Sequence, residues 1–177
     1  MKRIILIAIV LTGFMSVNKS FAQTATLNVT LSDVLSMTVS APTAVNFDTE
    51  AKYTSGVTLP LADHITVISS KGYTVKAISG AITGPSSLTA ATVKLTTTIG
   101  TSNAGNVGGT FTYASNLALP AVGGTAATVI SSTQTSWNLL VSANKFNVTY
   151  KIGEGGVYAG KTIGANVVPV IYTVTQP

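Results

Sequence analysis

The segment "TLNVTLSDVLSMTVS", residues 26–40, alternates apolar and polar side chains on both sides of Asp33. Such alternation is typical of a β-strand with one buried face, because successive side chains of a strand point to opposite sides. At about 3.3 Å per residue the segment would extend roughly 50 Å, whereas a usual strand spans about 17–20 Å. The segment is therefore long for one strand, and Asp33 interrupts its apolar face halfway.

Two interpretations of this N-terminal arm, residues 24–40, follow from its length. In the first, a strand at 24–31 precedes a bulge or crossing and a second strand at 34–41, as in strands that switch between sheets. In the second, residues 24–31 leave the domain and cover an open sheet edge, in the same chain or in a neighbouring one. The apolar face supplies the candidates for strand pairing in assembly: Leu27, Val29, Leu31, Leu35, Met37 and Val39.

Residues 1–22 have the pattern of a secretory signal peptide. A basic start and a short apolar run (4–15) precede small residues at the −3 and −1 positions of a cleavage before Gln23. The apolar run is shorter than the roughly 20 residues that span a bilayer. We therefore expect an exported protein whose mature part, residues 23–177, forms a single domain without a membrane span.

The chain has little charge and no cysteine. Charged residues make up 8% of it, and ten basic residues against five acidic ones give a net charge of +5. Three of the ten basic residues lie in the predicted signal peptide, so the mature part would keep seven and a net charge of +2. No basic cluster remains for a phosphate backbone, which argues against nucleic acid as a partner. Without cysteine, apolar burial and strand pairing must hold an exported fold together.

Short alternating or β-branched runs, separated by turn residues, fill the rest of the chain. No segment shows a convincing helical stripe, so we predict an all-β fold, an immunoglobulin-like antiparallel β-sandwich. Two hairpins are expected, 64–70 with 72–78 and 135–143 with 145–152, and residues 100–130 are expected to form an extended hairpin with long loops. The predicted strands are 44–48, 64–70, 72–78, 91–99, 110–114, 125–131, 135–143, 145–152 and 166–175.

Four side chains are expected in the core from these patterns. Trp137, Leu139 and Val141 share one face of a predicted strand, and Tyr172 belongs to the alternating apolar face near the C-terminus. Burying a large apolar side chain contributes about 1.5–3 kcal/mol. Pro169 cannot donate a backbone hydrogen bond, which places the C-terminal strand at a sheet edge or beside a bulge.

The sequence offers few catalytic or metal-binding side chains. It contains one histidine, His64, which we expect at the start of a strand with its ring at the edge of the sandwich. Asp63 and His64 would point to opposite faces of a strand, and no Gly-x-Ser-x-Gly motif is present, which argues against a nucleophilic triad. Zinc needs several nitrogen or sulfur ligands, and Asp48, Glu50 and Asp63 lack the spacing of a calcium loop. We expect no enzyme activity, no cofactor and no metal site.

Four stretches resemble known proteins: the N-terminal arm, "VNFDTEAKYTSGV" (45–57), "HITVISSKGYTVKAI" (64–78) and "YAGKTIGANVVPVIYTVTQ" (158–176). Together they resemble the pilin-like secreted β-sandwiches of bacteria, which include spore-coat-U-type and fimbrial subunits. The resemblance implies export by a Gram-negative bacterium to the cell surface, the extracellular space or the periplasm. It also implies assembly by donor-strand exchange, with a periplasmic chaperone or usher as candidate partners. Many fimbrial subunits contain a disulfide, which this chain lacks.

The sequence thus predicts a non-enzymatic structural or adhesive subunit that acts through strand pairing of its arm with another copy or another surface subunit. The alternative is a secreted glycan- or ligand-binding module that uses aromatic side chains near the loops. Gathering of these rings around one concave surface would favour the alternative. They are Tyr53, Tyr73, Phe111, Tyr113 and Tyr158.

Overall fold

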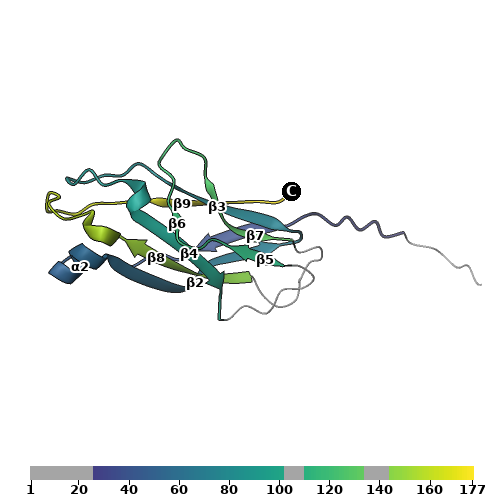
Figure 1. The fold of residues 1–177 in the computed structure, drawn as a ribbon. Helices are drawn as coiled ribbons and strands as arrows, with labels where there is room; N and C mark the ends of the chain where they lie inside the picture. The colour runs from purple at the N-terminus through teal and green to yellow at the C-terminus, as the bar shows by residue number, and fades with distance from the viewer. Residues whose placement is uncertain (1–25, 102–109, 134–143) are drawn as a thin grey trace, which may run out of the picture. The chain divides into compact units, whose positions relative to one another are not determined.

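The computed structural model of the chain describes residues 26–101, 110–133 and 144–177 (Figure 1). It divides into two units, one that ends at Leu31 and one from Ser32 to Pro177. In the first unit, residues 26–31 belong to no helix or strand. The strand predicted at 135–143, with its expected core residues Trp137, Leu139 and Val141, lies outside the described residues.

The second unit consists of two antiparallel β-sheets, which confirms the predicted all-β fold class. The first sheet has the order β1-β2-β8-β4-β6 and the second has the order β5-β7-β3-β9. The strands of the first sheet are β1 (Leu35–Val39), β2 (Val57–Ser69), β8 (Asn144–Ile152), β4 (Val93–Ile99) and β6 (Leu117–Ala118). The strands of the second sheet are β5 (Phe111–Tyr113), β7 (Ala127–Ser132), β3 (Tyr73–Ser79) and β9 (Val170–Thr175).

Strands of both sheets contribute side chains to one apolar core, mostly at alternate positions; in β7 the consecutive Val129 and Ile130 are both buried, beside a register shift in its pairing with β3. Each of these strands has one face of β-branched, aromatic or leucine side chains, which is the pattern that buries one side of a sheet. The members that are completely buried include Ile65 and Val67 of β2, Val75 of β3, Leu95 of β4, Val129 and Ile130 of β7, and Phe146 and Val148 of β8. Tyr172, expected in the core, is partly buried and packs against this cluster.

Helical structure among the described residues is limited to α2 (Glu50–Ser55) and two 3-10 turns, Ala90–Thr92 and Glu154–Gly156. Because α2 has only six residues, it is too short to show a helical stripe in the sequence. The strand predicted at 44–48 is wrong, since these residues are coil that leads into α2. No described helix has the length and apolar character needed to cross a membrane.

Strand β2 contains a bulge that changes the direction of His64. The pairing register with β8 shifts between Leu61 and Ile65, and Asp63 has a φ of 49°. His64 and Ile65 are consecutive, yet both are buried, with 1% and 0% of their surfaces exposed. A bulge breaks the strict alternation of a strand. The expectation that His64 begins a strand at the edge of the sandwich is therefore wrong, because it lies buried inside β2.

The predicted strands 72–78, 91–99 and 145–152 correspond to β3, β4 and β8, but the hairpin expected between 64–70 and 72–78 is wrong. β2 pairs with β1 and β8, whereas β3 pairs with β7 and β9. The tight turn after β2 therefore leads from one sheet to the other. Alternation identifies strands on both sides of a turn, but it does not show whether the two strands pair.

The region 100–130 contributes to both sheets and is not one extended hairpin. Within its described part, β5 pairs with β7 in the second sheet, while β6 pairs with β4 in the first. The predicted strands 110–114 and 125–131 correspond to β5 and β7. The two-residue strand β6 was not predicted, because so short a pairing leaves no periodic signal.

Both ends of the second unit form edge strands. β9 directly follows Pro169 and is the last strand of the second sheet among the described residues, which agrees with the first of the two predicted placements, a sheet edge rather than a bulge. In the N-terminal arm, β1 is the only strand among the described residues, and it pairs with residues 65–69 of β2. The interpretation of a second strand near 34–41 agrees with β1, whereas no strand is found at 26–31.

Candidate functional site

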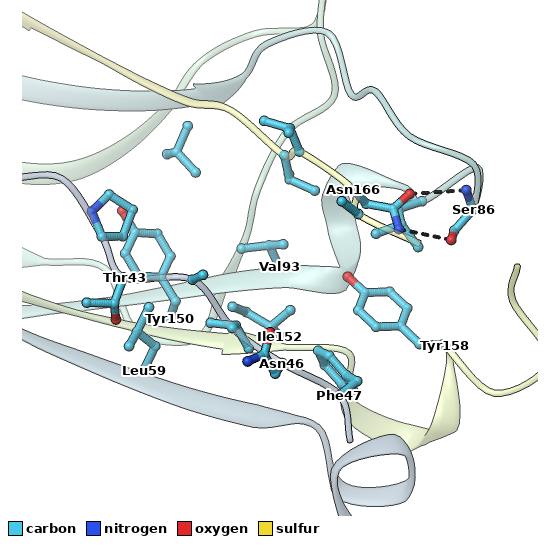
Figure 2. Close-up of a pocket in the computed structure, with 18 of the residues that line it drawn as sticks. Thr43, Asn46, Phe47, Leu59, Ser86, Val93, Tyr150, Ile152, Tyr158 and Asn166 are labelled. Carbon is cyan, nitrogen blue, oxygen red and sulfur yellow. Dashed lines mark hydrogen bonds between the residues drawn. The ribbon is translucent and has the colours of Figure 1, made fainter. Parts of the chain in front are cut away.

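An open groove with a volume of about 970 Å³ lies in the second unit. We call residues 40–48, the coil that follows β1, its first wall, and residues 161–172, which end in β9, its second wall. Side chains of β2, β4 and β8 form the floor between the two walls (Figure 2). Most of the lining is apolar and includes Val45, Leu59, Val93, Ile152, Val168 and Val170.

The first wall is coil because its sequence ends the pairing with β2. The backbone N–H of Ser40 still donates to the carbonyl oxygen of His64 at 2.9 Å. Two residues later Pro42 has no N–H to donate, so the ladder cannot continue past it. Residues 57–61 of β2 consequently pair with β8 on one side and with no described strand on the other. This leaves part of the edge of β2 open beside the groove.

The second wall is fixed by polar contacts with the loop at residues 83–86. Asn166 Nδ2 donates to Ser86 Oγ at 2.9 Å, and the backbone N–H of Ser86 donates to Asn166 Oδ1 at 3.1 Å (Figure 2). Ser86 Oγ also donates to the carbonyl oxygen of Thr162. Thr83 and Val167 exchange two backbone hydrogen bonds. Together with the hydrogen bond of 3.0 Å from the Gly80 N–H to the carbonyl oxygen of Pro169, these contacts hold the coil before β9 in position.

Four hydroxyl and imidazole groups form a hydrogen-bonded chain in the groove, which we call the groove chain. Ser40 Oγ lies 2.8 Å from His64 Nδ1, and His64 Nε2 lies 3.0 Å from the Tyr150 hydroxyl. The Tyr150 hydroxyl in turn lies 2.7 Å from the Tyr172 hydroxyl. Since Tyr150 is in β8 and Tyr172 is in β9, the groove chain connects the first wall with the second sheet.

Burial keeps the groove chain neutral near pH 7. Burial lowers the pKa of His64 below its ordinary value of 6.5. It also raises the pKa of Tyr150 and of Tyr172, the latter with a further contribution from the neighbouring Tyr150. Neutral imidazole and phenol groups can each donate one hydrogen bond and accept another, which allows all four members to be satisfied.

Aromatic rings close one end of the groove. The ring centre of Phe47 lies 5.6 Å from that of Tyr53 and 5.1 Å from that of Tyr158. Tyr158 is buried, and its hydroxyl forms a hydrogen bond of 2.8 Å with Thr92 Oγ1. Of the five aromatic residues predicted for a glycan site, only Tyr53 and Tyr158 line the groove.

The other three predicted aromatic residues belong to a different group. Tyr73 is buried in the core, and its ring lies 6.4 Å from that of Phe111. Phe111 and Tyr113 both pack against Phe146, at 5.3 and 6.2 Å between ring centres. The five rings therefore do not gather on one concave surface.

Structural partners are found for three of the polar residues considered for catalysis or metal binding: Asp48, Asp63 and His64. Asp48 forms an ion pair of 2.6 Å with Lys52. Asp63 Oδ2 lies 4.0 Å from Lys145 Nζ. Within the described part of the chain, no group of three or more His, Cys, Asp or Glu residues is arranged to hold a metal ion. The close contacts of His64 are hydroxyl groups, which form a buried chain that sequence reasoning did not predict because its members are far apart in sequence.

The predicted strand-pairing residues fall into two sets. Leu35 and Met37 of β1 are partly buried and pack against the core, and Val39 lines the groove. The other three are in the first unit and are largely exposed: Leu27 by 85%, Val29 by 69% and Leu31 by 89%. We call residues 26–31 the free arm. The role of all six residues in assembly stays a prediction.

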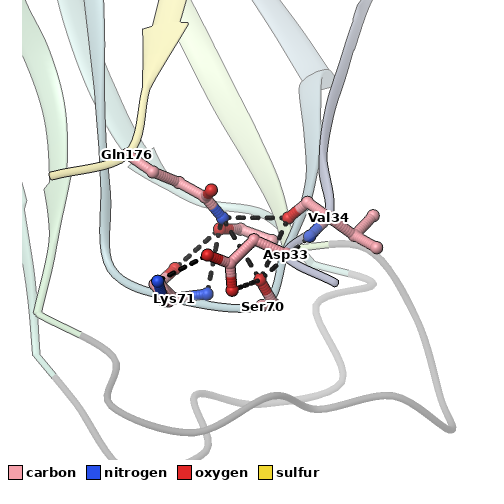
Figure 3. Close-up of polar contacts among 6 residues, drawn as sticks. Asp33, Val34, Ser70, Lys71 and Gln176 are labelled. Carbon is pink, nitrogen blue, oxygen red and sulfur yellow. Dashed lines mark hydrogen bonds and ion pairs between the residues drawn. The ribbon is translucent and has the colours of Figure 1, made fainter. Parts of the chain in front are cut away.

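A polar cluster marks the start of the second unit, directly after the free arm (Figure 3). Lys71 Nζ forms an ion pair with Asp33 Oδ2, and this hydrogen bond lowers the pKa of Asp33. Ser70 Oγ donates to Asp33 Oδ1 at 3.2 Å, and the backbone N–H of Val34 donates to Ser70 Oγ at 3.0 Å. Gln176 Nε2 donates to the carbonyl oxygen of Val34 at 2.9 Å. The cluster thus joins the beginning and the end of the second unit at the turn between β2 and β3.

Comparison with models of known protein families gives no match for this chain. Comparison with curated proteins also gives no match.

Proposed function

We propose that this protein is a secreted, non-enzymatic structural subunit whose immunoglobulin-like β-sandwich assembles by strand addition. The free arm of one copy enters the groove of the next copy and pairs with the open sheet edge beside it. One observation supports this proposal above the others: the same chain has an unpaired alternating apolar segment and an open apolar groove next to unpaired strand edges.

The free arm has the chemistry of a donor strand. Leu27, Val29 and Leu31 are spaced by two residues, so they share one face when the segment is extended. Their large exposure is unusual for neighbouring apolar side chains, because exposed apolar groups that cluster commonly mark an interaction site. The intervening Asn28 and Thr30 would face solvent once the apolar face is buried.

The groove has the chemistry of an acceptor. Its lining is mainly apolar, and β9 beside it has no described partner on its outer side. An extended segment added there would satisfy backbone groups of the edge and fill the groove with alternate side chains. The groove has few charges: of the described charged residues, Asp48 and Lys161 line it, and Asp48 is already paired with Lys52.

The energetics require both backbone pairing and apolar burial. Three buried apolar side chains contribute about 5–9 kcal/mol. Association itself costs about 4–15 kcal/mol. Each backbone hydrogen bond adds about 0.5–1.5 kcal/mol net. Apolar contact of the free arm offsets the lower part of this range, and a ladder along the edge of β9 would add the stabilisation needed for the upper part.

The first experiment replaces the apolar face of the free arm and measures association by sedimentation. The triple variant Leu27→Ser, Val29→Ser, Leu31→Ser is expected to lose concentration-dependent association while it keeps the melting temperature of the parent protein. The control variant Asn28→Ser, Thr30→Ser changes the other face and should associate normally. Association of the triple variant at parental concentrations would refute the proposal.

A second experiment distinguishes strand addition from unspecific apolar contact. The N–H groups of consecutive strand residues point to opposite edges, so Asn28→Pro and Val29→Pro each remove a backbone donor on a different side of the free arm, and one of them removes a donor that a ladder needs. We expect one of the two variants to weaken association, whereas Asn28→Ser and Val29→Ala weaken it less. If both proline variants associate like the parent, backbone pairing is not the mechanism.

A third experiment tests whether arm and groove act between copies. Val168→Glu introduces a charge into the groove lining, and Val122→Glu, at an exposed position outside the groove, is its control. Val168→Glu lacks a working groove, and the triple serine variant of the first experiment lacks a working arm, so each alone should stay monomeric. When the two are mixed they should form a one-to-one dimer, in which the intact arm of the groove variant enters the intact groove of the arm variant. Absence of this mixed dimer would exclude exchange between copies.

A further inference from the structure

The groove chain contains the only histidine of the sequence. Its four members come from four different segments: Ser40 from the first wall, His64 from β2, Tyr150 from β8 and Tyr172 from β9. All four line the groove. A change in the charge of His64 would therefore act at the place where the two walls and the floor meet.

The direction of the hydrogen bonds depends on the charge of His64. A neutral imidazole has one N–H donor and one acceptor nitrogen, so one neighbour receives a hydrogen bond from the ring and the other donates to it. A protonated imidazole donates from both nitrogens. Whichever tautomer the neutral ring adopts, protonation forces either Ser40 or Tyr150 to reverse its hydroxyl group. If Tyr150 reverses, Tyr172 must accept a hydrogen bond from the Tyr150 hydroxyl and donate its own hydrogen bond to a new acceptor.

Protonation also places a positive charge in a buried site. His64 has 1% of its surface exposed, and its ring stands edge-on to Tyr150 and Tyr172, with centres 5.7 and 6.1 Å away. Its hydrogen-bond partners are hydroxyl groups, none of which has a negative charge. The nearest acidic residue in its own strand, Asp63, lies close to Lys145. Burial is the cause that shifts the pKa of His64, and it shifts it downward.

The backbone connects His64 directly to the first wall. The Ser40 N–H donates to the carbonyl oxygen of His64 at 2.9 Å, in addition to the side-chain contact. After Ser40 the wall has no further ladder bond to β2, because β1 ends at Val39 and Pro42 follows. These two contacts therefore hold the beginning of the wall, and a movement of the charged ring toward water would disturb both.

We propose that His64 is a proton-operated switch of the groove, whose protonation releases the first wall at Ser40 from the floor. In mildly acidic solution the charged ring moves toward the groove, the groove chain breaks, and the wall opens. The consequence for association rests on the proposed function: an open wall loosens the seat of a neighbouring arm, so acid favours separation of the copies.

The first test follows His64 and the wall in the same samples, at concentrations below association. The single histidine gives an unambiguous NMR signal, and amide hydrogen exchange reports the Ser40 N–H. Between pH 8 and pH 4.5 we expect His64 to titrate with a midpoint below 6.5. Exchange at Ser40, corrected for its intrinsic pH dependence, should rise by up to about tenfold per pH unit as the pH falls from 6.5 to that midpoint, and it should level off below the midpoint. A midpoint at or above 6.5, or unchanged protection of Ser40 through the titration, would overturn the proposal.

The variant His64→Gln provides the matched control. Glutamine keeps a donor and an acceptor but has no charge to gain, so corrected exchange at Ser40 should become independent of pH. If the variant loses protection with acid as the parent does, His64 is not the switch. If the variant does not fold, the parent protein decides the question: exchange at Ser40 must level off at the pH at which His64 is half-protonated, and a mismatch of these two pH values refutes the switch.

Sedimentation at pH 7.5 and pH 5.5 tests the consequence for association. A wall opening of about tenfold, coupled to binding of the arm, should make the parent protein associate about tenfold more weakly at pH 5.5 than at pH 7.5. His64→Gln should associate equally at both pH values. Absence of association at both pH values refutes the proposed function but leaves the hydrogen-exchange result valid. Association that is strong and equal at both values, with an opened wall, refutes the coupling.

Discussion

Replacing Gly84 by alanine should release the second wall of the groove. The φ of Gly84 is +125°, and a Cβ atom there would lie 2.5 Å from Asn166 Oδ1 and 2.6 Å from the carbonyl oxygen of Ala165. A side chain in such a backbone conformation costs about 1–3 kcal/mol. Displacing Asn166 would also weaken its two hydrogen bonds with Ser86, each worth about 0.5–1.5 kcal/mol.

The sum for Gly84→Ala is a destabilisation of about 2–6 kcal/mol, or a fall in melting temperature of about 4–24 °C at 2–4 °C per kcal/mol. Gly123→Ala is the matched control, because Gly123 has a φ of +80° but nothing within 4 Å of the added Cβ. The control should lose only about 1–2 kcal/mol from the backbone conformation. Thermal melts of both variants by circular dichroism measure the difference. If Gly84→Ala melts no lower than Gly123→Ala, the contacts of Asn166 do not fix the wall.

Three further predictions concern the core, the groove chain and the polar cluster. Phe146→Ala removes a completely buried ring and should destabilise the protein by about 3–5 kcal/mol in urea unfolding, whereas the exposed Val122→Ala should change little. Tyr172→Phe removes the last hydroxyl of the groove chain and should cost about 0.5–1.5 kcal/mol, and ultraviolet titration of the remaining tyrosines should show an altered pKa of Tyr150. The pKa of Asp33 is lowered, so its ion pair stabilises the cluster above the ordinary pKa of 3.8, and this stabilisation is lost as the pH falls through the folded value. Hydrogen exchange at the Val34 N–H, which donates to Ser70, should therefore rise in acid in the parent protein, and Asp33→Asn should remove this acid-dependent rise.

The strands that could be predicted are those in which alternation continues without interruption. In β3, β4 and β8 every second side chain is buried, as in Val93, Leu95 and Thr97 of β4. Burial of one face contributes most to the stability of such strands, and it is visible in the sequence as a period of two. The edge position of β9 could be predicted for a different reason, because Pro169 removes a backbone donor.

The features that define the groove could not be predicted, because they depend on contacts between distant residues. The bulge that buries His64 requires the pairing register with β8, and the groove chain joins residues 22 and 86 positions apart. The coil of the first wall has the sequence pattern of a strand, since Val45 and Phe47 alternate with polar residues as strand residues do. Val45 and Phe47 line the groove and are partly buried there, but their backbone is coil and pairs with no strand. The alternation in this segment therefore comes from facing the groove and not from strand pairing.

The composition of the edges gives the strongest reason to expect an occupant for the groove. Proteins that stay monomeric protect their edge strands with charged side chains, prolines or covering segments. Neither β1, "LSMTV", nor β9, "VIYTVT", contains a charged residue, and Pro169 protects only the start of β9. Ile171 of β9 is 47% exposed, and Val167 before it is 58% exposed. An uncharged edge beside an open apolar groove promotes aggregation of a solitary domain, but it suits a subunit that receives a strand. The free arm of the same chain has the alternating apolar pattern that such a groove would accept.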